Sequence, residues 1–459
     1  MKKLYLKVKR TLRFIFYRDL DINEQLDISE NLVDDNLLTL YWNMSKADRQ
    51  HSYEVFKRTK KNSNDRDLLL LSLLHDIGKS KIHAGVIFRV LSDVGLINNN
   101  KILILIELQG ANDGLNTVIP YTQKFYYNLR PTIGIEKSKI LTIDKENGLH
   151  YSLKSLANLF EKGELKIVQN LGYPHPVLSH FRSIDIWETG GDGKSQSRNG
   201  WLVKSLEDYA KKTSVDAKAI FLDNSNSIFR GGHEGYLGPN ALGLEPQKIE
   251  VRDTIVPVDD RKNFGLLNDL IEKRKSSNES LNKFSYKLKQ SKKSFQFGGL
   301  RNKGGQLAVQ LENVCNMIGA GINIPVFKTA LGSFDTHNNQ EATHRRLLQN
   351  LDVSISLTVK ALKKIGVWEN TIIMTYSEFG RRAKENGSRG TDHGMAAPHF
   401  LIGGKINGGI IGEYDDLSKL WNNNINYKID YRSLYDFILR EHFNIKNNPF
   451  SKFNNKLIV

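Results

Sequence analysis

Acidic and histidine side chains lie beside short apolar runs at several places in this sequence. They are Asp113, Asp335 with His337, Glu378, and Asp392 with His393. Carboxylate and imidazole groups together are typical ligands of zinc, manganese or magnesium. Several carboxylates gathered in one place repel one another unless a cation neutralises them. The pattern therefore predicts a divalent-metal site where these segments meet.

Each of these residues also has an ordinary structural explanation. Asp113 could cap a turn, and Asp335 could be a simple loop residue. Glu378 could pair with Arg381 or Arg382, and His393 could be a buried, hydrogen-bonded histidine. A shared metal is favoured because all the segments flank predicted strands, and side chains at strand ends of one sheet can converge.

Ser179 is a candidate nucleophile, and it precedes a helix that we expect over residues 182–188. A metal beside Ser179 could ionise its hydroxyl, and an anion at the helix start would meet free backbone N–H groups. The alternative is that Ser179 only caps the helix. His180 could be a metal ligand, a base or a packed ring. Arg381 or Arg182 could hold the oxygens of an anion, because a guanidinium matches them in shape, or both could be surface residues.

Strand-like and helix-like segments alternate from residue 101 onward. Residues 101–108 form a continuous apolar run, typical of a strand buried on both faces. Further strands are expected at 167–168, 325–330, 371–375 and 399–402, and helices at 149–160, 307–318 and 347–362. This alternation predicts an α/β fold with a mostly parallel sheet covered by helices on both faces. Residues 273–303, rich in Lys, Ser and Asn, are expected to be a loop or insertion.

The segment before residue 98 has a different character, with helical patterns only. The Leu-rich run at 67–74 predicts a buried helix, which ends at His75 and Asp76. These two residues and His51, on the preceding helix, could bind one metal. Over residues 40–97 this part resembles the first half of an HD phosphohydrolase domain.

The sequence thus predicts two parts. Residues 1–97 are expected to be a small helical segment, either a truncated and inactive HD-like remnant or a plain helical extension. Residues 101–453 are expected to form one α/β domain that carries the metal site.

Composition narrows the class of protein. The chain of 459 residues has 39% hydrophobic and 25% charged residues, which is ordinary for a globular protein. Its one cysteine, Cys315, excludes a thiolate metal cluster. No apolar run is long enough to span a membrane, and the basic N-terminus lacks the features of a secretion signal. The sequence leaves the location open, with the cytoplasm as the default expectation. The formal charge of +16 comes from scattered residues, so no specific nucleic-acid partner is expected.

Longer motifs give the α/β domain a family resemblance. They are Gly110 to Asn116 with Pro120-Tyr121, Gly172 to Gly190, Gly200-Trp201, Phe334 to His337 with Gln340, Ser377 to Arg381, and Gly390 to Gly394. Over residues 102–435 or so, the chain resembles the domain of unknown function 1501 family, which is grouped with the sulfatase-like, alkaline-phosphatase-like superfamily.

The resemblance implies a metal-bound hydroxyl nucleophile that attacks phosphate or sulfate esters. By position, Asp113 would be the ligand after the first strand and Ser179 the nucleophile, while Asp335 and His337 would be paired ligands. His393 matches the superfamily's final histidine, and Asp392 adds a carboxylate beside it. Where the superfamily has Asp-His, this sequence has Glu378-Phe379, which removes an imidazole.

Metal-dependent hydrolysis of a phosphate or sulfate ester, small or polymeric, is therefore the predicted function. One alternative is a non-catalytic protein that keeps a metal for its structure or binds a partner. Another is an HD-type nucleotide phosphohydrolase acting through His51, His75 and Asp76.

Overall fold

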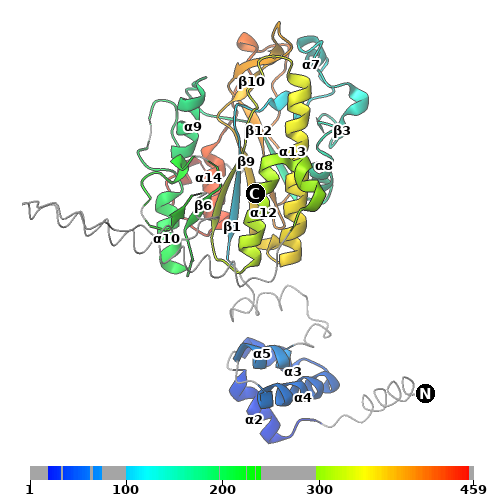
Figure 1. Cartoon of the computed structure of the whole chain (residues 1–459), viewed down its shortest axis with the longest axis vertical. Coiled ribbons are helices and arrows are strands. Elements are labelled where there is room, and N and C mark those ends of the chain that lie inside the picture. Colours follow the sequence, from blue (N-terminus) through cyan, green and yellow to red (C-terminus); the bar gives the residue numbers. More distant parts are fainter. Residues whose placement is uncertain are drawn as a thin grey trace, which may run out of the picture. The chain divides into compact units, whose positions relative to one another are not determined.

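The chain divides into two compact units, Met1–Asn99 and Asn100–Val459. The structure is a computed structural model that describes residues 19–32, 35–62, 66–74, 100–195, 197–223, 225–232, 234–238 and 296–453. The first unit contains the helices α2 (Ile22–Asn31), α3 (Asp35–Trp42), α4 (Lys46–Asn62) and α5 (Arg66–Leu74) (Figure 1).

The helices of the first unit enclose a small apolar core. Tyr41, Phe56 and Leu73 are its most buried members, together with Ile28 of α2. The helix predicted at 67–74 corresponds to α5, on which Leu70, Leu73 and Leu74 are buried. His51 is exposed on α4, whereas His75 and Asp76 lie outside the described residues. The resemblance to an HD domain finds no support in the described part of this unit.

The second unit is built on a nine-stranded sheet with the strand order β13-β5-β12-β9-β1-β8-β6-β7, in which β14 also pairs with β5. Every pairing is parallel except those of β12, which runs antiparallel to both its neighbours. The strands are β1 (Ile102–Leu108), β5 (Leu165–Gly172), β6 (Ala219–Phe221), β7 (Tyr236–Leu237), β8 (Val326–Leu331), β9 (Thr371–Tyr376), β12 (Ala397–Gly403), β13 (Gly409–Ile411) and β14 (Ile429–Asp430).

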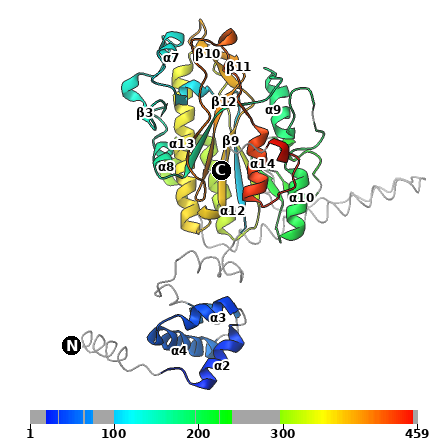
Figure 2. The ribbon, with the colours of Figure 1, turned by 180° about the vertical axis from the view of Figure 1, so that it is seen from behind.

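Helices cover both faces of this sheet (Figures 1 and 2). One core contains residues of α8 (Lys154–Glu161), α12 (Arg301–Gly319) and α13 (Gln340–Ile365). The other contains residues of α9 (His180–Thr189), α10 (Val203–Lys212) and α14 (Arg432–Phe437). Successive residues of β1 alternate between the cores, because side chains of a strand point to opposite faces. The predicted α/β class, with a mostly parallel sheet covered on both faces, is confirmed.

Most predicted elements are present with shifted ends. The helix predicted at 149–160 begins later, at Lys154, because Gly148–Leu149 forms the short strand β4, which pairs with β2 (Val118–Ile119) and β3 (Leu141–Thr142). The strand expected at 167–168 extends through the eight residues of β5. Most of the expected loop at 273–303 lies outside the described residues, and its end forms the start of α12. In the described part of the chain, no helix is long and apolar enough to cross a membrane.

A buried group of charges ties α9 to the sheet. The Lys328 ammonium lies 2.9 Å from a Glu107 carboxylate oxygen and 3.5 Å from one of Glu188, and it also contacts Asp223. All four side chains are nearly or fully buried. Because Glu188 is on α9, Lys328 on β8 and Glu107 on β1, this network fixes the helix that carries His180 against the two central strands.

The network predicts a pH-dependent stability. Burial raises the pKa of Glu107 to about 7, although the Lys328 ammonium opposes this shift. The folded protein therefore binds this proton more tightly than the unfolded chain, in which the carboxyl titrates near 4.5. The stabilisation from this proton is complete below the pKa of the unfolded chain, near 4.5, and is lost as the pH rises through the pKa of the folded protein, about 7. Between about pH 5 and 8, we expect the free energy of unfolding to lose on the order of 1–3 kcal/mol from this group.

Urea denaturation of the full chain, followed by tryptophan fluorescence across this pH range, measures the effect. Glu107→Gln has no carboxyl group to ionise at this position and should flatten the pH dependence of stability. Glu161→Gln, at an exposed position of α8, should leave that dependence unchanged. Equal pH dependence in wild type and Glu107→Gln would contradict the assignment.

Candidate metal centre

The loops at the carboxyl edge of the sheet bring distant segments together. Asp335 and His337 follow β8, Glu378 follows β9, and His180 begins α9 after β5. His393 lies on β11 (Thr391–Gly394), which pairs with β10 (Gly380–Glu385) in a hairpin that precedes β12. Because β12 is antiparallel, the segment before it lies at the same edge as the segments that follow the parallel strands. Topology thus explains why these residues meet.

Gly110 allows two of these loops to touch. It has a φ of +104°, and a Cβ atom there would lie 2.4 Å from the backbone nitrogen of Asp335. Only glycine combines this backbone conformation with such a close approach. The loop after β1 therefore packs directly against the loop that carries Asp335.

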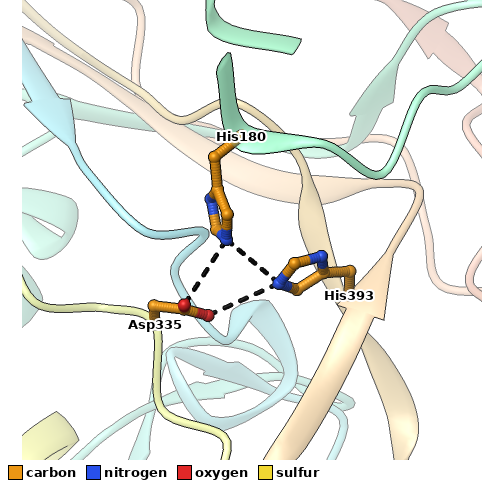
Figure 3. Close-up of side chains that lie close together, drawn as sticks. All are labelled: His180, Asp335 and His393. Atoms are coloured by element: carbon orange, nitrogen blue, oxygen red, sulfur yellow. Dashed lines mark hydrogen bonds and ion pairs between the residues drawn. The ribbon is translucent and has the colours of Figure 1, made fainter. Parts of the chain in front are cut away.

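Three side chains form the centre of the cluster: His180, Asp335 and His393 (Figure 3). Each offers one ligand atom, and these atoms all lie within 4.8 Å of one another. The Nε2 atoms of His180 and His393 are 3.0 Å apart. Asp335 places Oδ2 3.5 Å from the first of these nitrogens and Oδ1 3.4 Å from the second. All three side chains are partly exposed, so the cluster is open to solvent.

Hydrogen bonds on the far side of each ring define which nitrogen carries the proton. The Nδ1 atom of His393 lies 2.9 Å from the carbonyl oxygen of Leu178, which can only accept a hydrogen bond. The Nδ1 atom of His180 lies 2.7 Å from Oε1 of Glu378. When Nδ1 donates in both rings, the neutral forms direct two Nε2 lone pairs at each other. Two facing lone pairs require a proton or a metal cation between them, and an outer acceptor on Nδ1 is typical of metal-bound histidine.

His337 forms a second close pair of ring nitrogens with His393. Its Nε2 lies 3.0 Å from Nε2 of His393 and 3.0 Å from Oδ1 of Asp335. Its Nδ1 lies 3.5 Å from Oδ1 of Asp392, which in turn accepts a hydrogen bond from the Asn386 side chain. That hydrogen bond holds the pKa of the Asp392 carboxyl below its usual value. The structure thus places His337 at the edge of the cluster and Asp392 behind it.

Glu378 supports the cluster from behind and does not face its centre. Its Oε1 also accepts the backbone N–H of Gly110, and its Oε2 accepts the hydroxyl of Ser377. Burial opposes ionisation, but these hydrogen bonds and that of His180 outweigh it and lower the pKa of Glu378. Both carboxylate oxygens of Glu378 therefore accept hydrogen bonds within the protein. The sequence-based prediction that Glu378 is a metal ligand is corrected, because its carboxylate holds the outer nitrogen of His180. The hydrogen bond to Glu378 also raises the pKa of His180.

Glu378→Gln tests this orienting role. The amide oxygen can still accept the His180 proton, but the negative charge is lost. We expect metal affinity to fall by about tenfold, the lower end of the range for such outer partners, with the fold intact. Titration of the metal-free protein with Zn²⁺ measures the change, with Glu161→Gln as a control that should bind like wild type. A complete loss of binding would instead mean that Glu378 is itself a ligand.

Arg381 is a positioning residue and is not available to a substrate. Its side chain is fully buried. It donates to Oδ1 of Asp335 at 2.5 Å and to the carbonyl oxygens of Ala111, Thr391, Phe334 and Gly110. Burial raises the pKa of Asp335, but Arg381 more than offsets this and keeps the carboxylate charged. The predicted anion-binding role of Arg381 is thus corrected, because every nitrogen of its guanidinium is engaged inside the protein.

Asp113 is not brought into the cluster. Its carboxylate forms two contacts with Arg130, at 2.5 and 2.9 Å, and accepts a further hydrogen bond from Gln340. The side chains of Asp113 and Arg130 are both almost completely buried. Burial alone would raise the pKa of Asp113, but the Arg130 charge lowers it below its usual value. The sequence-based prediction that Asp113 is a metal ligand does not fit this arrangement, because the guanidinium occupies both oxygens.

Ser179 lies between two residues that contact the cluster. The carbonyl oxygen of Leu178, on one side, accepts the His393 hydrogen bond, and the ring of His180, on the other, belongs to the cluster. Ser179 stands at the start of α9, but its hydroxyl does not cap the helix. The side chain is exposed. The capping role considered for Ser179 is therefore not present, and its exposed side chain directly precedes His180 of the cluster.

Sequence reasoning missed the groups that orient the histidines. The Leu178 carbonyl gives no sequence signal, since any residue has one. Phe379 packs its ring against both His180 and His393, at centroid distances of 4.9 and 4.7 Å. The phenylalanine that replaces an expected imidazole therefore acts as an apolar support for the two rings.

Comparison with known proteins gives a family match and several remote structural likenesses. No curated protein matches the sequence. The structure described as Ps i-CgsB in complex with k-i-k-neocarrahexaose has a TM-score of 0.35 at 12% identity, covering 77% of this chain and 74% of that chain. A protein in the alkaline phosphatase superfamily from Vibrio parahaemolyticus has a TM-score of 0.31 at 11% identity, covering 68% and 62%.

A third similar structure is the C-terminal periplasmic domain of EcEptC from Escherichia coli, in complex with Zn. It has a TM-score of 0.27 at 8% identity and covers 67% of this chain and 74% of that chain. Likeness at this level carries no argument about what this chain binds. The family match is different in kind, because it rests on the sequence: residues 314–441 match the family described as "Protein of unknown function (DUF1501)", which confirms the family resemblance over the segment that carries Asp335, His337, Glu378 and His393.

Proposed function

We propose that the second unit is a metal-dependent hydrolase of phosphate or sulfate esters. One divalent cation, zinc, manganese or magnesium, would be held by His180, Asp335 and His393, with His337 at the edge of the site. Ser179 would be the nucleophile. The substrate would be an anionic ester, either a small molecule or part of a polymer.

One observation carries the proposal more than any other. The Nε2 atoms of His180 and His393 lie 3.0 Å apart, while the outer nitrogen of each ring lies within hydrogen-bonding distance of an acceptor. A carboxylate oxygen of Asp335 completes the group. Two neutral imidazoles and one carboxylate form a donor set that suits zinc and similar ions, and the open side leaves room for a substrate oxygen.

The residues of this chain would then have separate roles. A divalent cation in such a site polarises an ester oxygen and lowers the pKa of a nearby hydroxyl. Ser179, an exposed residue directly before His180 of the cluster, would attack the phosphorus or sulfur atom and displace the alcohol of the ester. Water would then release phosphate or sulfate and restore the serine hydroxyl. The helix α9 begins at the next residue, so the anionic oxygens of the ester would meet backbone N–H groups that have no partner within the helix.

Removing and restoring the metal tests the proposal. The full chain is treated with EDTA, returned to Zn²⁺, Mn²⁺ or Mg²⁺ separately, and assayed with aryl phosphate and aryl sulfate esters. We expect hydrolysis of one ester class to vanish with EDTA and to return with at least one metal. Asp335→Asn should lose both metal and activity, whereas Asp113→Asn should keep its metal because that carboxylate faces Arg130.

The outcomes separate enzyme from binding protein. Metal that binds with no turnover of either ester class, in wild type and variants alike, would contradict hydrolysis and favour a binding role. An Asp335→Asn variant that retains wild-type metal content would contradict the site itself. His175→Ala is the matched control, since this exposed histidine precedes α9 but takes no part in the cluster.

A further inference from the structure

The edge of the sheet opposite the candidate metal centre also contains a cavity. The cavity, of about 310 Å³, is lined there by residues at the amino ends of parallel strands, such as Thr371 at the start of β9 and Lys101 just before β1. Lys405, which also lines it, follows the carboxyl end of the antiparallel β12. The metal cluster uses the other ends of these strands, so the cavity is separate from it.

The cavity combines positive charge with an apolar wall. Lys101, Lys166 and Lys405 all line it. The apolar lining comes from Ile372, Ile406 and Phe437. Two acidic residues, Glu369 and Glu441, also reach the cavity, and Glu441 is paired with Arg440 at 3.2 Å.

Lys166 is the most unusual of the lining residues. Only 4% of its surface is exposed, yet no hydrogen bond or ion pair of its ammonium is present in the described part of the chain. A buried lysine is normally paired, because removing its charge from water without a partner is costly. Burial lowers the pKa of Lys166 accordingly. Lys166 lines the cavity, where a ligand could supply a partner for its ammonium.

The neighbouring lysines strengthen the case. Lys101 is half-buried, and among the described residues its ammonium makes a long contact, 3.5 Å, with the Asn370 side chain. Burial, and after it the charge of Lys405, lowers the pKa of Lys101. Three lysines and two acidic residues line the cavity, and Glu441 is already paired with Arg440, so an entering anion would offset the remaining positive charge.

We infer that this cavity binds a small organic anion, with its carboxylate or phosphate group on Lys166 and a short apolar chain against Ile372, Ile406 and Phe437. The volume is at the lower end of the range for small-molecule sites, about 300–1,000 Å³, which fits a ligand of a few carbon atoms. This site is independent of ester hydrolysis at the metal centre.

The test uses hexanoate and hexyl phosphate as probes and hexan-1-ol as the uncharged probe. Isothermal titration of the full chain is carried out in EDTA, so that a metal ion cannot hold either anion. We expect saturable binding of at least one anion and weaker binding of the alcohol. Lys166→Met keeps the unbranched shape of the side chain but removes the charge, and it should weaken anion binding by about tenfold or more. Its ester hydrolysis should equal that of wild type.

Two further variants complete the design. Lys101→Met should weaken binding by about threefold or more, which provides a second measure if Lys166→Met folds poorly. Lys204→Met, an exposed lysine on α10, should leave binding unchanged. The inference is overturned if neither anion binds, if hexan-1-ol binds as tightly as the anions, or if the folded Lys166→Met or Lys101→Met variant binds like wild type.

Discussion

Replacing Ser179 with alanine should lower ester turnover by about 10³-fold or more while the protein keeps its metal. The expected loss is large because the hydroxyl would form the bond to the phosphorus or sulfur atom, and alanine has no group to replace it. Metal content should be unchanged, since the cluster consists of His180, Asp335 and His393. The measurements are kcat with an aryl phosphate or sulfate and elemental analysis of the same sample.

The matched control is Ser214→Ala, an exposed serine that follows α10. It should turn over substrate like wild type. A Ser179→Ala variant that retains most of the wild-type kcat would contradict the nucleophile assignment and leave a metal-bound water as the attacking group. Simultaneous loss of metal and activity would mean that Ser179 supports the cluster instead.

The second large effect is expected at the buried pair of Asp113 and Arg130. Arg130→Met should destabilise the second unit by about 3–5 kcal/mol, because it leaves the Asp113 charge buried without its partner. Arg130 also donates to the Asn116 side chain and to the carbonyl oxygen of Ala383, so these acceptors lose their hydrogen bonds as well. Chemical denaturation of the full chain measures the loss.

A double variant separates the charge from the packing. Asp113→Asn combined with Arg130→Met should be less destabilised than the sum of the single variants, because no uncompensated charge remains. Lys428→Met breaks a more exposed pair with Asp415 and should cost no more than about 1 kcal/mol. A cost that small for Arg130→Met would contradict the view that this pair holds the loop after β1.

The alternation of elements in the second unit could be predicted from the sequence because its strands are buried on both faces. A short, continuous apolar run such as 101–108 indicates a buried strand, and apolar residues at helical spacing over a long segment such as 347–362 indicate an amphipathic helix. Short elements were missed where tertiary pairing decides. The three residues of β6 and the hairpin of β10 and β11 have no strong pattern of their own, and they form strands because a neighbouring strand offers partners.

The sequence indicates that several of the candidate residues gather at one edge of the sheet, but it does not indicate the contacts of each side chain. Strand ends identify Asp335 and His393 correctly as neighbours, although the reason for His393 is the antiparallel direction of β12, which the sequence does not reveal. Direct ligands and supporting residues have the same side-chain chemistry. Glu378 hydrogen-bonds the outer nitrogen of His180, and Asp113 faces Arg130. A direct ligand differs from a supporting residue only in what its carboxylate oxygens contact, and these contacts depend on the packing of the folded chain.

X-ray absorption spectroscopy of the zinc-loaded full chain tests the central claim most directly. The account predicts about one ion per chain, with nitrogen ligands at about 2.0–2.1 Å that include imidazole rings and with oxygen at a similar distance. His393→Ala should remove imidazole from the spectrum or abolish binding. A protein that takes up no zinc, or whose zinc has no imidazole ligands, would contradict it.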